Sequence, residues 1–242
     1  MKKLATLLVA IAALIMFGHA RAETLDDANR AFAGGHYHDS TLGYQAVLAE
    51  NGYSAPVLFD LGNSYFREGD LAQAILAYQR AKWLAPNDPD IAANLALAQK
   101  QVGLPVAEPR WSDKVARLLN ASGWAWLGCA AWTLLCLSLL GRSIFPQRRA
   151  LFSFSAVFGA LVLCTVVASM WVSSESLRQA VVMDKNASAL ISPFPDAQSA
   201  FSPSPGETVT VQKAYDDFLL VKDAAGKSGW ISKKQIMPIV PS

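Results

Sequence analysis

Charged residues are scarce in this 242-residue chain: Asp, Glu, Lys and Arg make up 17%, against about a quarter in an average soluble protein. Hydrophobic residues reach 52%, and this balance excludes a disordered, solvating chain. The formal net charge of +2 is too small to indicate a nucleic-acid-binding protein, and three cysteines are too few for a disulfide-built scaffold. One ordinary soluble domain does not explain this composition, and the excess of apolar residues lies in three uncharged runs.

The first apolar run lies at the N-terminus. Lys2 and Lys3 precede an uncharged stretch over residues 4–17, and Ala20-Arg21-Ala22 follows. A short basic segment, an apolar core and an A-x-A site are typical of a secretory signal peptide, here over residues 1–22. We predict cleavage after Ala22. The alternative is an uncleaved anchor, although the apolar core is short for a membrane span.

Two further uncharged runs, over residues 121–141 and 150–172, are each long enough to cross a bilayer as a helix. Trp124, Trp126 and Trp171 lie near their ends, where indole rings favour the membrane interface. The alternative is a buried core hairpin, but the rest of the chain is too small to cover two such helices. The sequence therefore predicts a transmembrane helical hairpin with a lipid bilayer around it.

The loop between the two runs, residues 142–149, contains Arg142, Arg148 and Arg149 and no acidic residue. Cytoplasmic loops carry an excess of Lys and Arg, so we expect this loop in the cytoplasm. The predicted signal peptide places the chain that follows it outside the cytoplasm. Both the N-terminal and the C-terminal domain are therefore expected on the extracytoplasmic side.

Residues 28–81 repeat with a period of 34, the length of a tetratricopeptide (TPR) repeat, which is a pair of helices. The aligned pairs are Ala28 with Gly62, Gly35 with Gly69, Tyr37 with Leu71, Ser40 with Ala74, Tyr44 with Tyr78 and Val47 with Ala81. Residues 89–101 resemble the first helix of a third repeat, which Gly103 and Pro105 would end. We predict an α-helical TPR solenoid over residues 23–104, with two repeats and a capping helix.

Arrays of this kind bind peptides on the concave face, which the first helix of each repeat lines. The repeat register places these side chains on that face: Asn29, Phe32, Phe59, Asn63, Phe66 and Arg67. The amides would bond an extended backbone, and the rings would pack against its side chains. The alternative is that these residues only cover a helix surface or pack against the third helix. Phe59 stands where related arrays have a lysine that binds a C-terminal carboxylate, so that form of recognition is not expected.

After residue 172 the pattern changes to short β-type runs, over residues 180–183, 208–211, 218–221, 229–231 and 236–240. Residues 223–226 form the turn of a predicted hairpin, and the four prolines of residues 191–205 indicate a long loop. The spacing of Gly206, Phe218 and Gly226 resembles the bacterial SH3-like family. We therefore expect a small all-β SH3-like barrel over residues 178–242. The aromatic and proline set that grips proline-rich helices is missing, and Trp230 is interpreted as structural.

Residues that carry catalysis are few. His36 and His38 flank Tyr37 after a Gly-Gly turn and would point to different helix faces, so a surface turn is favoured over a site. The cysteines, Cys129, Cys136 and Cys164, all lie in the predicted spans. There is no CxxC, no HExxH and no glycine-rich phosphate loop. We expect a protein that is not an enzyme, with no cofactor and no metal.

The order of segments completes the prediction: signal peptide, TPR domain, linker with an amphipathic segment (105–120), two spans joined by an arginine loop, and SH3-like domain. This multi-domain membrane protein resembles the BatE family of the Bat aerotolerance operons over nearly the whole chain. The stretch from Leu58 to Tyr65 and that from Ala81 to Asp90 are particularly similar. The family usually has two asparagines around Leu-Gly, whereas here Asp60 replaces the first and Asn63 keeps the second.

The resemblance implies protein partners and no reaction. Bat proteins are thought to form membrane complexes with von Willebrand A-domain proteins, alongside a MoxR-type AAA+ ATPase. It therefore implies a non-catalytic scaffold in the bacterial inner membrane, with periplasmic domains, linked to aerotolerance or envelope stress tolerance. The alternative is a membrane-anchored peptidoglycan-binding protein that acts through its SH3-like domain. Nucleic acid is not an expected partner.

Overall fold

The computed structural model describes residues 25–240 except 107–114, 116–117 and 120. The predicted signal peptide and most of the predicted linker at 105–120 lie outside the described residues. The described chain divides into two compact units, one within Met1–Val106 together with Gln179–Ser242, and the other within Ala107–Arg178. The first unit therefore contains segments from both sides of the second in the sequence.

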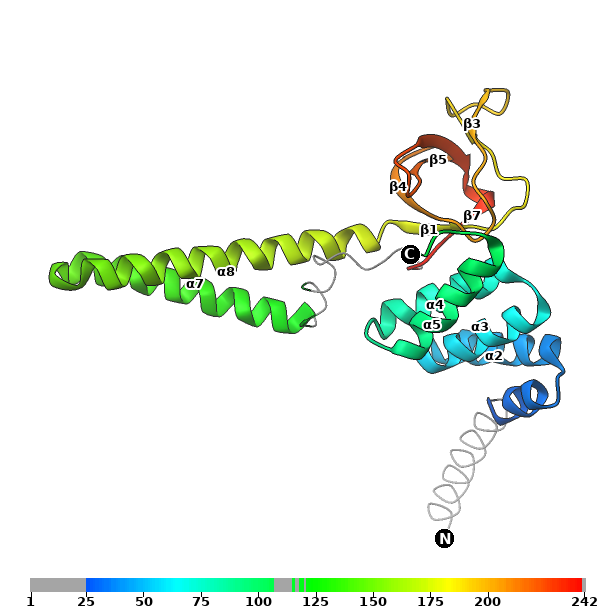
Figure 1. Cartoon of the computed structure of the whole chain (residues 1–242), viewed down its shortest axis with the longest axis horizontal. Helices are drawn as coiled ribbons and strands as arrows, with labels where there is room; N and C mark the ends of the chain where they lie inside the picture. The colour runs from blue at the N-terminus through cyan, green and yellow to red at the C-terminus, as the bar shows by residue number, and fades with distance from the viewer. Residues whose placement is uncertain (1–24, 107–114, 116–117, 120, 241–242) are drawn as a thin grey trace, which may run out of the picture. The chain divides into compact units, whose positions relative to one another are not determined.

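The N-terminal part of the first unit consists of antiparallel helices (Figure 1). A helix over residues 25–33 is followed by α2 (Tyr37–Asn51), α3 (Ala55–Glu68), α4 (Leu71–Leu84) and α5 (Pro89–Val102). Gly35, Gly69 and Gly103 end three of these helices with φ of 79–85°, a left-handed conformation that favours glycine. Asp70 and Asp88 cap the next helices through their side chains. The predicted helical repeats and the predicted third-repeat helix are thus confirmed.

Small residues bring these helices close together, as the repeat pattern predicts. A Cβ on Gly62 of α3 would lie 2.5 Å from the Tyr78 ring of α4, so only glycine fits there. Ala74 and Ala81 of α4 are fully buried, as are the larger side chains of Tyr44 and Tyr78. The repeat core therefore consists of aromatic rings set against small residues.

The second unit is a helical hairpin of α7 (Ala121–Ile144) and α8 (Arg149–Ser176), joined through the 3₁₀ turn η1 (Pro146–Arg148). The helices pack closely: a Cβ on Gly159 would lie 3.2 Å from the Ala131 carbonyl oxygen. Ser138 and Ser155 share a hydrogen bond of 2.8 Å between their hydroxyls. Gly141 faces the ring of Phe152.

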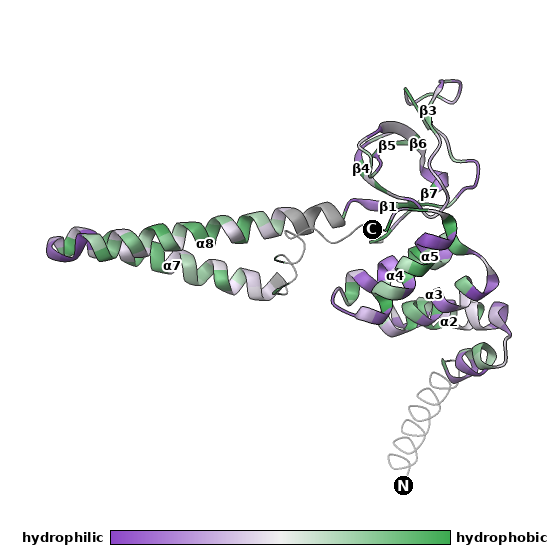
Figure 2. Ribbon diagram, in the orientation of Figure 1, coloured by the Kyte–Doolittle hydropathy of each residue, from purple (hydrophilic) through white to green (hydrophobic). Residues whose placement is uncertain are grey.

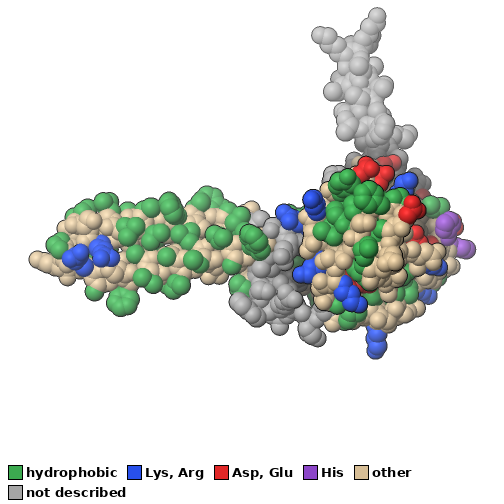
Figure 3. All heavy atoms as spheres, turned by 90° about the horizontal axis from the view of Figure 1, so that it is seen from above, with side chains coloured by type: hydrophobic (Ala, Val, Ile, Leu, Met, Phe, Trp, Pro, Cys, Tyr) green, Lys and Arg blue, Asp and Glu red, His purple; other side chains and the backbone are tan. Residues whose placement is uncertain are grey.

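The outward surface of this hairpin is apolar. Hydrophobic residues follow both helices, with hydrophilic ones at the connecting turn (Figures 2 and 3). Trp126, Phe154 and Trp171 are each more than 70% exposed. Ser122–Ile144 and Pro146–Trp171 are long and apolar enough to cross a membrane, by length and composition. They contain most of the two predicted spans.

The C-terminal residues form an antiparallel sheet of seven strands in the order β3-β2-β6-β5-β4-β1-β7. The strands are β1 (Gln179–Val182), β2 (Ala189–Leu190), β3 (Ser199–Phe201), β4 (Thr208–Tyr215), β5 (Phe218–Lys222), β6 (Ser228–Ser232) and β7 (Ile236–Pro238). The five predicted strands correspond to β1, β4, β5, β6 and β7. The short strands β2 and β3 were not predicted.

Two corrections follow for this region. The predicted barrel is wrong, because among the described strands β3 and β7 stay at opposite edges and the sheet is not closed. Both edge strands are three residues long, and Pro238 ends β7 without an N–H to donate, so neither supports a closing ladder. The predicted loop at 191–205 is also corrected, because it contains β3. This strand pairs antiparallel with β2, and the register shifts between Ala189 and Leu190.

Candidate peptide-binding groove of the repeats

A cavity of about 190 Å³ lies on the repeat helices. Its lining comes from helix 25–33, α3, α4 and α5: Phe32, Asn63, Phe66, Arg67, Tyr78, Asn94 and Leu97. Four of the six predicted residues, Phe32, Asn63, Phe66 and Arg67, are thus brought together. We call this cavity the groove.

Asn63 is held at the centre of a polar cluster. Its Oδ1 accepts hydrogen bonds from the Tyr78 hydroxyl at 2.8 Å and from Nδ2 of Asn94 at 2.9 Å. Two donors occupy the two lone pairs of this amide oxygen. Among the described contacts none involves Nδ2 of Asn63, so this group is a donor for an acceptor that enters the groove. A peptide carbonyl is such an acceptor.

Asn29 repeats this arrangement one period earlier but does not line the groove. Its Oδ1 accepts a hydrogen bond from the Tyr44 hydroxyl at 2.7 Å. Phe59 does not line the groove either. It is half-buried and packs against the repeat core, with its ring centroid 5.9 Å from that of Tyr78. The structure therefore gives Phe59 a packing position in the repeat core.

Arg67 supplies the positive charge of the groove. Its guanidinium carbon lies 4.7 Å from the ring centroid of Tyr37, and its Nη2 donates a hydrogen bond to the Tyr37 hydroxyl. Phe32 in turn meets Tyr37 edge-on, with ring centroids 5.5 Å apart. Because none of the described lining residues is acidic, this cation is available to an acidic group of a ligand.

Burial keeps the tyrosine donors of the cluster protonated. Desolvation, with the nearby Asp60 carboxylate as a second cause, raises the pKa of Tyr44 to about 12. Desolvation also raises the pKa of Tyr78 well above its ordinary value. The pKa of Asp60 is itself raised by burial. Both hydroxyls therefore remain hydrogen-bond donors to Asn29 and Asn63 above about pH 10, where an exposed tyrosine would ionise.

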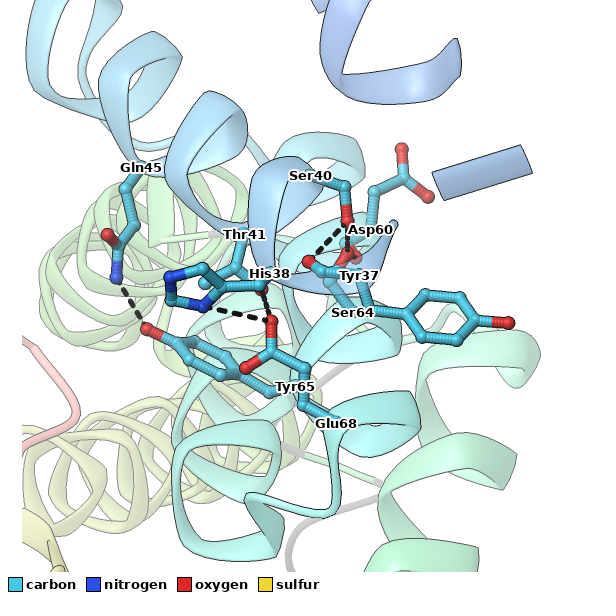
Figure 4. Close-up of polar contacts among 9 residues, drawn as sticks. All are labelled: Tyr37, His38, Ser40, Thr41, Gln45, Asp60, Ser64, Tyr65 and Glu68. Atoms are coloured by element: carbon cyan, nitrogen blue, oxygen red, sulfur yellow. Dashed lines mark hydrogen bonds and ion pairs between the residues drawn. The ribbon is translucent and has the colours of Figure 1, made fainter. Parts of the chain in front are cut away.

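Polar contacts between α2 and α3 hold the neighbouring repeat in place (Figure 4). The hydroxyls of Ser40 and Ser64, both fully buried, lie 2.8 Å apart. Thr41 donates to Glu68 at 2.7 Å, and Gln45 donates to the Tyr65 hydroxyl at 2.5 Å. These bonds fix the orientation of α3, which carries Asn63, Phe66 and Arg67.

The histidines lie away from the groove. His38 is exposed, with its Nδ1 3.9 Å from Oε1 of Glu68, and His36 precedes α2. Among the residues that the structure describes, no group of three or more His, Cys, Asp or Glu side chains is placed to hold a metal ion.

Three lining residues were not predicted: Tyr78, Asn94 and Leu97. Leu97 follows Asn63 by one period of 34, so extending the repeat register to the third helix would have found it. Asn94 has no such signal, because its place depends on how α5 packs against α3. The repeat pattern marks Tyr78 as a core residue, and its hydroxyl bonds Asn63 beside the groove.

The comparison with protein families agrees with this architecture. Residues 62–103, which run from α3 through α5, match the TPR repeat family. No curated protein matches the chain. The chain is therefore a TPR-containing protein, and TPR repeats generally mediate protein–protein interactions.

Proposed function

We propose that this protein is a non-catalytic, membrane-anchored scaffold whose repeat groove binds an extended segment of a partner protein. The observation that carries the proposal is the groove itself, where rings and a leucine surround one amide donor and one cation. An extended peptide would place a carbonyl on Asn63, an apolar side chain between Phe32, Phe66 and Leu97, and an acidic group on Arg67.

Membrane anchoring rests on the hairpin of α7 and α8. Its outward apolar side chains need an apolar environment, and their extent matches a bilayer. The arginines at the turn, Arg142, Arg148 and Arg149, fit the cytoplasmic side by the positive-inside rule. The groove would then lie in the periplasm. Anchoring beside a membrane-bound partner raises the effective concentration of the two proteins.

The finer proposal is a Bat-type complex in the bacterial inner membrane. The resemblance to the BatE family supports von Willebrand A-domain membrane proteins and MoxR-system components as partners, with a role in aerotolerance or envelope stress tolerance. The TPR repeats and the two apolar helices are consistent with this family, whose segments follow the same order.

Co-purification of the full-length chain from detergent-solubilised membranes tests the proposal. The variants are Phe66→Ala and Arg67→Gln, which remove groove contacts without disturbing the Asn63 cluster. Truncating a residue at the centre of an interface often weakens the binding free energy by more than about 1–2 kcal/mol. We therefore expect roughly tenfold lower recovery of the A-domain partner. Leu42→Ala, an exposed apolar residue of α2 outside the groove, is the control. Equal recovery with all four chains would contradict the proposal.

A second candidate function is peptidoglycan binding by the C-terminal sheet, and one observation favours it. Cross-strand register places Tyr215, Phe218, Leu220 and Trp230 on one face of the sheet. The Tyr215 ring is half-exposed and meets Trp230 edge-on at 6.2 Å between centroids. Aromatic rings on an open face can stack on the apolar faces of sugars. Full-length protein should then sediment with purified sacculi, and Tyr215→Ser should reduce sedimentation while Phe194→Ser should not.

A further inference from the structure

Among the described residues, the third repeat is represented by one helix. The first repeat consists of the helix 25–33 and α2, and the second of α3 and α4, but the third contributes only α5 among the described residues. In a helical array each repeat buries its apolar face against the next, and an end without a neighbour needs a cap. The flank of α4 beside α5, which a further helix would cover, carries the apolar side chains of Ala72 and Ile75.

The C-terminal sheet covers this flank. Ile75 is completely buried, and a Cβ on Gly206, in the turn before β4, would lie 2.6 Å from its Cδ1. Val181 of β1 and Ile239 after β7 are buried in the same hydrophobic cluster as the repeat core. Met183 and Leu104 pack against that cluster from its margin. Residues separated by the whole helical hairpin in sequence thus share one core.

Polar contacts close the edge of this interface. Arg80 of α4 donates from Nε to the carbonyl oxygen of Ile239 at 3.2 Å, and from Nη2 to that of Pro238 at 3.0 Å. Its guanidinium carbon also lies 5.4 Å from the ring centroid of Tyr53, in the turn between α2 and α3. Beside it, Nε2 of Gln79 donates to Oγ1 of Thr208 at 3.3 Å. The carbonyls that Arg80 binds belong to the end of an edge strand, which would otherwise be open to other chains.

We infer that the C-terminal sheet is the cap of the TPR array and covers the flank of α4 that a second helix of a third repeat would cover. The segments before and after the helical hairpin are therefore one structural module, and neither is a separate domain on a flexible tether. This inference goes beyond partner binding in the groove, and it holds whether or not the groove binds a peptide. It also requires both segments to lie on the same side of any membrane that the hairpin crosses.

Cross-linking in the full-length chain tests the inference. Gln79→Cys and Thr208→Cys are combined in a background where Cys129, Cys136 and Cys164 are replaced by Ala. A protease site inserted between Phe145 and Pro146 allows the two halves to be separated. After treatment with a short bis-maleimide and cleavage, we expect the halves to stay joined on a denaturing gel.

The matched control pairs Gln79→Cys with Asp217→Cys, in the turn after β4. The end of β4 before this turn, Tyr215, lies roughly 23 Å along the strand from Thr208 at about 3.3 Å per residue. This pair should leave the halves separate. Equal joining in both pairs, or joining in neither, would overturn the inference.

Hydrogen exchange of the full-length chain gives an independent readout. Arg80→Ala should speed exchange of the amides in β7 and the residues after it, including that of Ile239, which donates to the Gln179 carbonyl at 3.0 Å. Lys100→Ala, an exposed cation on α5, should leave these amides unchanged. If Arg80→Ala also leaves them unchanged, Arg80 does not link the two segments and the polar part of the interface is wrong.

Discussion

The hydroxyl of Tyr78 donates to the amide oxygen of Asn63 across 2.8 Å, and one repeat earlier Tyr44 makes the same bond to Asn29 across 2.7 Å. The two pairs are related by the 34-residue period, so the repeat conserves a polar bond as well as an apolar core. In the second copy Asn94 adds a further bond, which orients the free amide hydrogens of Asn63. The repeat geometry thereby orients the Nδ2 donor of Asn63 in the groove.

Alkaline pH should weaken the fold through Tyr44. Its pKa rises from 10.0 in the unfolded chain to about 12 in the folded one, so the folded state holds this proton more tightly. The contribution to stability is complete below about pH 10 and is lost as the pH rises toward about 12. A tyrosinate absorbance titration, taken as the difference between the wild type and Tyr44→Phe, should show a midpoint near pH 12. A midpoint near pH 10 would show that the hydroxyl is not buried.

The buried serine pair should behave as a unit. Ser40→Ala or Ser64→Ala alone removes the hydrogen bond between the two hydroxyls, which should cost about 1 kcal/mol in the free energy of unfolding. The hydroxyl that stays keeps its bond to a carbonyl oxygen, that of Tyr37 for Ser40 and that of Asp60 for Ser64. The double variant should cost less than the sum of the two single changes, because each single change already removes the same bond between the two hydroxyls. Chemical unfolding followed by circular dichroism gives all three values. Ser54→Ala is the control, since the Ser54 side chain makes no capping hydrogen bond; strict additivity would argue against the pair.

Adding one methyl group at Gly62 should damage the repeat core. Its Cβ would lie 2.5 Å from the Tyr78 ring, and overpacking of this kind typically costs about 1–3 kcal/mol. We expect Gly62→Ala to lower the thermal midpoint of the full-length chain. Gly34→Ala, where the nearest side-chain atom belongs to the exposed His36, should change it less. The reverse order of the two variants would contradict the packing described for α3 and α4.

Single cysteines should report the predicted topology. In the cysteine-free background, Glu50→Cys on α2 and Lys227→Cys on the sheet should react with a membrane-impermeant maleimide from the same side. Gln147→Cys, in the turn between α7 and α8, should react only from the other side. Labelling of all three positions from one side would exclude two membrane spans.

Local signals were enough to predict most elements and part of the groove. The 34-residue period predicted the repeat helices, and the uncharged runs predicted α7 and α8, because both patterns depend on short-range spacing. Phe32, Asn63, Phe66 and Arg67 were found because the repeat register places them on one face. Asn94 and the position of Phe59 were not, since they depend on how α5 and the core pack. The barrel prediction failed because strand spacing does not reveal which edges pair.

The sequence alone determined the helical period, the apolar hairpin with its arginine turn, and the residue types available to the groove. Tertiary structure decided that Arg80 of α4 meets the carbonyls of Pro238 and Ile239, more than 150 positions later. The physical reason is that periodicity specifies which face of an element is apolar, whereas its partner is selected by long-range packing. Here that packing joins the sheet to the repeats and leaves the sheet open.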